Sequence, residues 1–197
     1  MVAMAESTDS ISIPHGRPFT VRDLEAFPDD GNRYELLDGM LLVSPAPGFR
    51  HQKVVLKLAA LLDAVCPDGM HVLPAPFGVQ PNESTELQPD VLVTRDEDVT
   101  EKNLPVAPLL AVEVLSPSTA LIDRNTKKAA YLRMGVPSYW VIDPRKPSLT
   151  VFELDRTTFG YEHVADIVGN KAFDATQPFP VRVIPADLLG GLAPERR

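Results

Sequence analysis

Two carboxylates stand in stretches of the sequence that are otherwise suited to a buried core. Glu113 interrupts the apolar run of residues 109–115, and Asp90 opens the β-branched run that follows Pro89. An ionised carboxylate in a buried strand needs a partner or a metal, and Mg²⁺ is often held in proteins by one or two carboxylates. If the two strands are neighbours, Asp90 and Glu113 predict a site for a divalent cation. The alternative for Glu113 is a solvated position at the open end of its strand.

The strand that contains Glu113 is followed by a turn and a helix. A Ser-Pro-Ser turn begins at Ser116, and residues 118–134 are predicted to be helical, with Ser118 or Thr119 as the N-cap and Gly135 just beyond the end. Residues 138–142 form the next strand. A helix between two strands predicts a βαβ-like unit with parallel pairing.

Helix geometry distinguishes two adjacent lysines on this helix. With an advance of about 100° per residue, Lys127 falls in one stripe with Ala130 and Tyr131, whereas Lys128 is rotated away. A lysine in a largely apolar stripe must extend to solvent or find an anionic partner. The geometry therefore favours Lys127 as the partner of the two carboxylates. The alternative is an i,i+4 ion pair with Asp123.

Five ordered blocks of sequence carry a resemblance to a known family. The blocks are YELLDGMLLVSPAPGFRHQ, QPDVLVT, AVEVLSPST, DRNTKKAAY and GVPSYWVIDP, within residues 19–154. They resemble the Uma-two-like endonucleases of the PD-(D/E)XK nuclease superfamily. The resemblance implies a restriction-endonuclease-like core, Mg²⁺ or Mn²⁺ held by Asp90 and Glu113, and DNA as the substrate. Leu115 stands where the superfamily usually has its lysine, and the family pattern implies Lys127 as the catalytic cation instead.

Two further residues are candidates for the site. Glu35 lies in the first arm of a predicted hairpin, and the resemblance makes it an additional acidic member. Taken alone, the residue pattern favours an exposed cross-strand charge at this position. His51 stands near the start of the next helix, where it can orient the helix, meet a phosphate or have no chemical role.

The composition is that of an ordinary globular protein. Of 197 residues, 44% are hydrophobic and 23% charged, which fits one domain with its own core. We expect a mobile tail at residues 1–18 and a single domain at residues 19–197. Cys66 is the one cysteine, which excludes an internal disulfide and favours a cytoplasmic protein. The sequence shows no secretory signal and no apolar stretch near the ~20 residues that span a bilayer.

The predicted fold class is mixed α/β, with a central mixed β-sheet flanked by helices and an N-terminal β-hairpin. Asp38-Gly39 between two apolar runs is a strong hairpin signal. Residues 49–65 have helical apolar spacing, and residues 90–94 form the strand that Asp90 opens. Residues 148–154 and 161–165 predict an antiparallel pair, and residues 179–184 a last strand.

These patterns predict a metal-dependent DNA endonuclease. A homodimer is a further expectation, since nucleases that cut both strands often dimerise. The alternative is a nuclease-fold protein that binds DNA or a protein partner without cutting. The net charge of −8 favours this alternative, because DNA-binding surfaces are usually basic. The trio of Asp90, Glu113 and Lys127 favours the enzyme, because a binding protein does not need it.

Overall fold

A computed structural model describes residues 16–117 and 122–192 of the chain. Most of the expected N-terminal tail lies outside this range, and so do the two residues proposed as the helix cap, Ser118 and Thr119. Within the described residues, no helix is both long and apolar enough to cross a membrane.

The centre of the fold is a six-stranded mixed sheet, as the sequence predicted. Its strand order is β11-β10-β9-β8-β6-β3. Strands β8 and β9 are parallel and are joined through a helical segment, whereas the other neighbours are antiparallel. The strands are β3 (Met70–Pro74), β6 (Val91–Arg95), β8 (Leu110–Val114), β9 (Ser138–Asp143), β10 (Ser148–Asp155) and β11 (Gly160–Val168).

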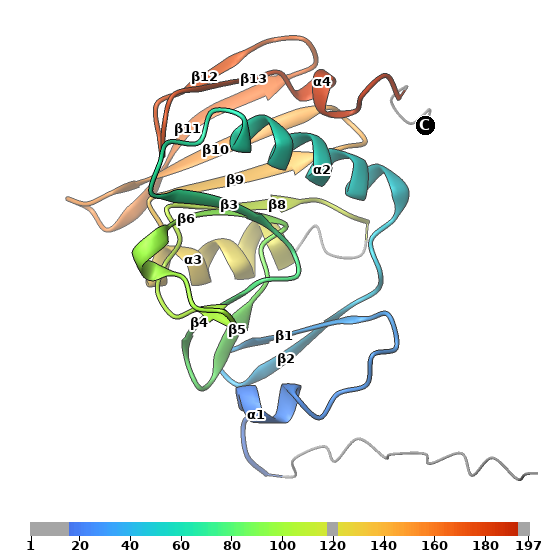
Figure 1. Ribbon diagram of the computed structural model, residues 1–197, viewed down its shortest axis with the longest axis vertical. Coiled ribbons are helices and arrows are strands. Elements are labelled where there is room, and N and C mark those ends of the chain that lie inside the picture. Colours follow the sequence, from blue (N-terminus) through green and yellow to red (C-terminus); the bar gives the residue numbers. More distant parts are fainter. Residues whose placement is uncertain (1–15, 118–121, 193–197) are drawn as a thin grey trace, which may run out of the picture.

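One face of this sheet is covered by helix α2 (Phe49–Asp63), with the short helix α4 (Pro185–Leu188) and the hairpin β12 (Phe173–Ala175) and β13 (Val181–Val183) beside it (Figure 1). Val54, Val55, Leu58 and Leu62 recur at helical spacing and pack on this sheet face. The apolar stripe of α2 therefore fixes how the helix lies on the sheet.

The opposite face carries helix α3 (Lys128–Met134) and a second sheet, seen below the first in Figure 1. The order of this sheet is β2-β1-β5-β4-β7. Its strands are β1 (Arg33–Leu37), β2 (Met40–Ser44), β4 (Gly78–Asn82), β5 (Thr85–Leu87) and β7 (Asn103–Leu104), and helix α1 (Val21–Leu24) lies next to β1. Asp38 and Gly39 both have positive φ, 51° and 80°, as the two-residue turn of the predicted hairpin requires.

The helical connection from β8 to β9 differs from the prediction. Residues Ile122–Lys127 form a π-helix, which continues directly into α3. A π-helix has i→i+5 hydrogen bonds and occurs often at functional sites, but its residues do not differ in pattern from those of an α-helix. The predicted end of the helix is confirmed, because Gly135 has φ +80°.

Candidate active site

Asp90 and Glu113 come together because β6 and β8 are antiparallel neighbours. Val91 pairs with Val112 in this ladder, so Asp90, one residue before β6, lies beside Glu113. The backbone N–H of Val114 donates a hydrogen bond to Oδ2 of Asp90 at 2.8 Å. The predicted adjacency of the two strands is confirmed. Asp90 is 2% exposed and Glu113 is 1% exposed, so the alternative of a solvated Glu113 is wrong.

Three donors hold the carboxylate of Asp90. Arg33 Nη1 lies 3.0 Å from Oδ1, and Nε2 of His51 lies 3.0 Å from Oδ2, where the Val114 N–H also donates. Burial alone would raise the pKa of Asp90, but the hydrogen bond from His51 and the charges of His51 and Arg33 outweigh burial and hold the pKa below its ordinary value. Asp90 is therefore a carboxylate near neutral pH, and Nε2 of His51 donates to it.

Glu113 belongs to a second group of contacts around Lys127. The Nζ atom of Lys127 lies 3.2 Å from Oε1 of Glu113 and 2.8 Å from Oε1 of Glu35. The hydroxyl of Tyr131 donates to the same Glu113 oxygen at 3.0 Å. Burial, followed by the charges of Glu113 and Glu35, raises the pKa of Tyr131 well above its ordinary value, so this hydroxyl stays protonated.

The two neighbouring lysines point to different surroundings, as helix geometry predicted. Lys127 is 3% exposed and lies between the two glutamates. Lys128 Nζ instead lies 3.9 Å from the centre of the Phe152 ring, in a cation–π contact. The alternative partner for Lys127, Asp123, has a side chain outside the described part of the structure.

Glu35 is the clearest correction to the residue-by-residue expectation. It is 1% exposed, so the expectation of an exposed cross-strand charge is wrong. Its Oε1 accepts the backbone N–H of Gln88 at 2.7 Å as well as the ammonium of Lys127. Strand β5 runs beside β1, and it is this pairing that covers Glu35 and supplies the Gln88 donor.

Arg33 is a site residue that the sequence analysis missed. It stands two positions before Glu35 on β1, and alternate residues of a strand face the same side. That spacing was an available signal. Burial alone would lower the pKa of Arg33, but the neighbouring charges of Asp90 and Glu35 raise it, so Arg33 is a permanent cation.

Six charged or polar side chains line one pocket of about 280 Å³, which we call the carboxylate pocket. They are Arg33, Glu35, His51, Asp90, Glu113 and Lys127. Three carboxylic side chains thus share this pocket with Arg33, His51 and Lys127. The close approach of several carboxylates favours the binding of a further cation.

The donor set fits a magnesium ion better than a metal enclosed by protein ligands alone. Among residues 16–117 and 122–192, no three His, Cys, Asp or Glu side chains are arranged to hold a metal. Mg²⁺ needs only one or two carboxylates, because water and substrate phosphates complete its shell. Asp90 and Glu113 supply hard oxygen donors of this kind. The pocket beside them has room for the water and the substrate phosphate.

Comparisons with known proteins agree with this geometry. No curated protein matches the chain. The fold is similar to that of a crystal structure described as a putative nuclease belonging to DUF820, from Anabaena variabilis ATCC 29413. The TM-score is 0.66 at 18% sequence identity, and the match covers 88% of this chain and 98% of the other. At this identity the likeness shows the restriction-endonuclease-like fold, which confirms the predicted fold class.

The family is shown by sequence. Residues 21–186 match the model of the Uma2 family, which is described as "Putative restriction endonuclease". The match covers most of the chain and includes every residue of the carboxylate pocket named above. The resemblance drawn from the five sequence blocks is therefore confirmed, and the chain belongs to the Uma2 family of restriction-endonuclease-like proteins.

Proposed function

We propose that this protein is a divalent-metal-dependent DNA endonuclease in which Asp90 and Glu113 hold Mg²⁺ or Mn²⁺. The observation that carries the proposal is the position of Lys127, whose Nζ lies 3.2 Å from Oε1 of Glu113 in the pocket that Asp90 also lines. Leu115, at the position usual for the superfamily's lysine, is 1% exposed and packs in an apolar cluster. Lys127 supplies from the helix the cation that Leu115 cannot supply from the strand.

The reaction is the hydrolysis of a phosphodiester. The oxygen of water forms a bond to phosphorus and gives up one proton, one ester P–O bond breaks, and the departing deoxyribose oxygen takes up a proton. Asp90 and Glu113 would hold the divalent cation, which would polarise a phosphate oxygen and lower the pKa of a bound water. Lys127 stabilises the negative charge that develops on the phosphate, and Glu35 holds Lys127 in place through their 2.8 Å ion pair.

Residues in and around the pocket orient the two carboxylates. Tyr131 donates to Glu113, and His51 and the Val114 N–H donate to Asp90. Fixed donors of this kind keep a ligating carboxylate in one orientation, which raises metal affinity. Arg33, the most exposed of these polar partners at 20% of its side chain, faces the open pocket and binds a substrate phosphate.

The experiment is DNA cleavage by the purified full-length protein with Mg²⁺ or Mn²⁺, on both a supercoiled plasmid and a circular single strand. We expect Lys127→Ala to lose cleavage by roughly 100-fold or more, as for other groups that stabilise developing charge. Lys128→Ala is the matched control and should lose at most a few-fold. Full activity in Lys127→Ala, or the reverse ranking of the two lysines, would contradict the assignment.

Metal binding is measured separately by calorimetry with MnCl₂. Asp90→Ala and Glu113→Ala should each lose the binding shown by the wild-type protein while keeping its circular dichroism spectrum. Undiminished binding in both variants would exclude the proposed ligands. A wild-type protein that binds Mn²⁺ but cuts neither DNA form would instead favour the alternative of a binding protein. Homodimerisation and a cytoplasmic location stay predictions.

A further inference from the structure

The carboxylate pocket is the middle of a longer trough. On one side it shares Arg33, Ala46 and Pro47 with a pocket of about 540 Å³, which we call the aromatic pocket. On the other side it shares four residues with a pocket of about 360 Å³, which we call the arginine pocket; they are Gly48, His51, Ser116 and Pro117. The three hollows therefore adjoin one another through shared lining residues, with the candidate catalytic carboxylates in the middle one.

The arginine pocket has side chains that can bind a phosphate and a base. Arg50 and Arg145 line it, and the guanidinium of Arg145 also pairs with Asp143 at 3.3 Å. Phe49 also lines it and is 70% exposed. Proteins that bind single-stranded nucleic acid combine an exposed aromatic ring with nearby cations, so that phosphates lie on the cations and a base stacks on the ring.

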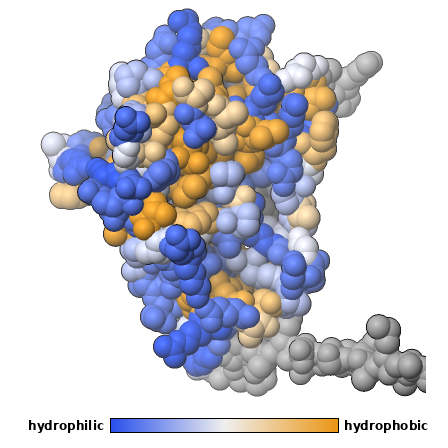
Figure 2. Space-filling view, in the orientation of Figure 1, coloured by the Kyte–Doolittle hydropathy of each residue, from blue (hydrophilic) through white to orange (hydrophobic). Residues whose placement is uncertain are grey.

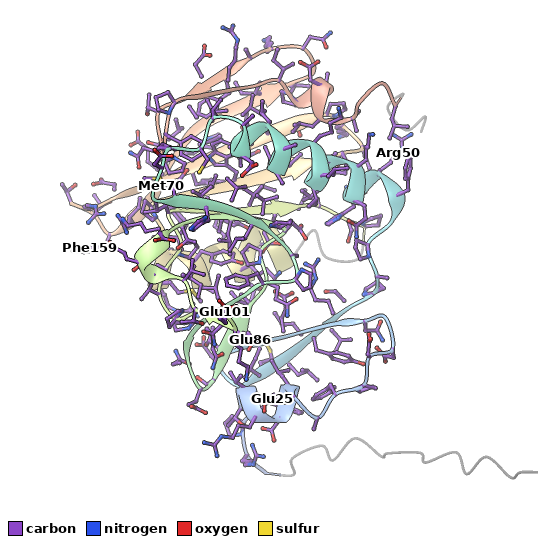
Figure 3. All side chains as sticks on the ribbon, viewed as in Figure 1. Glu25, Arg50, Met70, Glu86, Glu101 and Phe159 are labelled. Atoms are coloured by element: carbon purple, nitrogen blue, oxygen red, sulfur yellow. The ribbon has the colours of Figure 1, made fainter. Side chains whose placement is uncertain are left out.

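The aromatic pocket has the opposite charge. Glu25, Asp29 and Glu86 line it with only two cations, Arg33 and Lys102. In Figure 3, Glu25 and Glu86 lie on the side of the second sheet, whereas Arg50 lies at the start of α2. Glu25 pairs with Lys102, and Asp29 and Glu86 can accept hydrogen bonds from the amino groups of a base.

The aromatic pocket also offers the groups that hold a base. The rings of Phe27 and Tyr34 lie side by side with centroids 4.6 Å apart, and both line this pocket. A Cβ on Gly78 would lie only 3.1 Å from Oε1 of Glu86, so the glycine leaves room for this carboxylate. Burial raises the pKa of Glu86, which further suits it to hydrogen bonding with a neutral base.

The burial of the candidate catalytic residues favours single-stranded DNA over duplex DNA as the substrate. Asp90, Glu113 and Lys127 are 1–3% exposed and are reached through a pocket of about 280 Å³. An unpaired strand bends its backbone toward such a pocket more easily than a stiff duplex does. The net charge of −8 disfavours a duplex more than a single strand, because a duplex carries the denser phosphate charge.

We propose that the trough binds one unpaired DNA strand across the catalytic centre. A phosphate lies between Arg50 and Arg145 with a base on Phe49, and a base beyond the cleaved bond enters the aromatic pocket. This names the substrate class of the site and rests on the proposed function for the position of the cleaved bond.

The first test measures fluorescence anisotropy of labelled DNA with the full-length protein in EDTA, where no cleavage occurs. We expect an unpaired 20-nucleotide strand to bind at least about 10-fold tighter than the same sequence in a duplex. Phe49→Ala should weaken single-strand binding roughly 5- to 150-fold, the range expected for loss of one base stack. Phe159→Ala removes an exposed ring on the β10–β11 turn, outside the trough (Figure 3), and should leave binding unchanged.

The second test compares affinities for oligo-dA, oligo-dC and oligo-dT. Glu86→Gln should change their ranking, whereas the matched change Glu101→Gln, at an exposed residue outside the trough, should not. An unchanged ranking in Glu86→Gln would show that no base enters the aromatic pocket.

The outcomes separate this inference from the proposed hydrolysis. Equal or tighter binding of the duplex, or equal effects of Phe49→Ala and Phe159→Ala, would overturn the single-strand inference even if the protein cuts DNA. Single-strand preference that depends on Phe49 supports the inference even if neither DNA form is cut, in which case the proposed hydrolysis alone is wrong.

Discussion

The chemistry of individual residues could be predicted where a charge interrupts an apolar pattern. Asp90 and Glu113 could be predicted as site residues because their neighbours in sequence are typical of a buried core. Lys127 could be predicted because it lies in an apolar stripe of its helix. The burial of Glu35 could not be predicted in this way. Glu35 is buried where a distant part of the chain packs against it and the Gln88 N–H donates to its carboxylate. The residues next to Glu35 in the sequence do not predict that contact.

At the residue scale, Tyr131 gives a prediction about pH. Burial and the charges of Glu113 and Glu35 raise its pKa in the folded protein, so folding favours the protonated phenol. This contribution to stability is complete below pH 10, the ordinary tyrosine value, and is lost as the pH rises toward the pKa of the folded state. Above pH 10 the unfolded chain binds one proton fewer than the folded protein.

The measurement is urea unfolding at several pH values between 9 and 11.5. We expect the free energy of unfolding of the wild-type protein to fall above pH 10 by about 1.4 kcal/mol per pH unit more than that of Tyr131→Phe. Parallel pH profiles for the two proteins would mean that Tyr131 ionises in the folded state as easily as in the unfolded chain.

At the element scale, the length of each helix or strand determined whether it could be predicted from the sequence. The hairpin, helix α2 and strands β6, β8, β9, β10 and β11 follow from apolar periodicity over five or more residues. Strands β5, β7 and β12 have two or three residues each, too few for a period to be recognised. Strands β5 and β7 form because longer neighbours offer them a ladder, and β12 pairs with the equally short β13, so tertiary context determines all three.

Helix α3 ends in a way that gives the second prediction. The N–H of Val136 donates to the Tyr131 carbonyl at 3.0 Å, and the N–H of Gly135 donates to the Leu132 carbonyl at 2.9 Å. With Gly135 at φ +80°, this is a Schellman motif. Because a side chain is strained at such a φ, Gly135→Ala should lower the free energy of unfolding by about 1 kcal/mol.

The control for this prediction is Gly160→Ala. The φ of Gly160 is outside the left-handed region, and a Cβ there would meet Thr158 Oγ1 at an ordinary 3.5 Å. We expect its effect to stay within about 0.5 kcal/mol of wild type. At Gly135, by contrast, a Cβ meets nothing within 4 Å. A cost at Gly135 no larger than that at Gly160 would therefore contradict backbone strain as the cause.

At the scale of the whole molecule, the candidate site is formed where two layers meet. Asp90 and Glu113 come from the six-stranded sheet, whereas Arg33 and Glu35 come from the second sheet. Figure 2 shows polar and apolar residues interspersed over the face that carries α2, with apolar residues gathered toward the upper half. The sequence predicted a single central sheet, and the second sheet was missed because two of its five strands are so short.

The meeting of the two layers gives the last prediction. Leu87, on β5, is fully buried in the cluster that also contains Tyr131 and Leu115, and the next residue, Gln88, donates to Glu35. Leu149 is equally buried, on β10, in the cluster on the opposite sheet face. Changing either leucine to alanine should lower the free energy of unfolding by roughly 2–5 kcal/mol.

The two variants should differ in function although they are alike in stability. Leu87→Ala leaves a cavity beside β5, which loosens the Gln88–Glu35 hydrogen bond and so the Glu35–Lys127 ion pair. Its cleavage rate, measured well below the unfolding midpoint, should fall about 10-fold or more, because small displacements of a catalytic group are costly. Leu149→Ala, remote from the carboxylate pocket, should keep its rate within about two-fold of wild type. Equal losses in both variants would show that the second sheet does not position Lys127, and that general loss of stability is the cause.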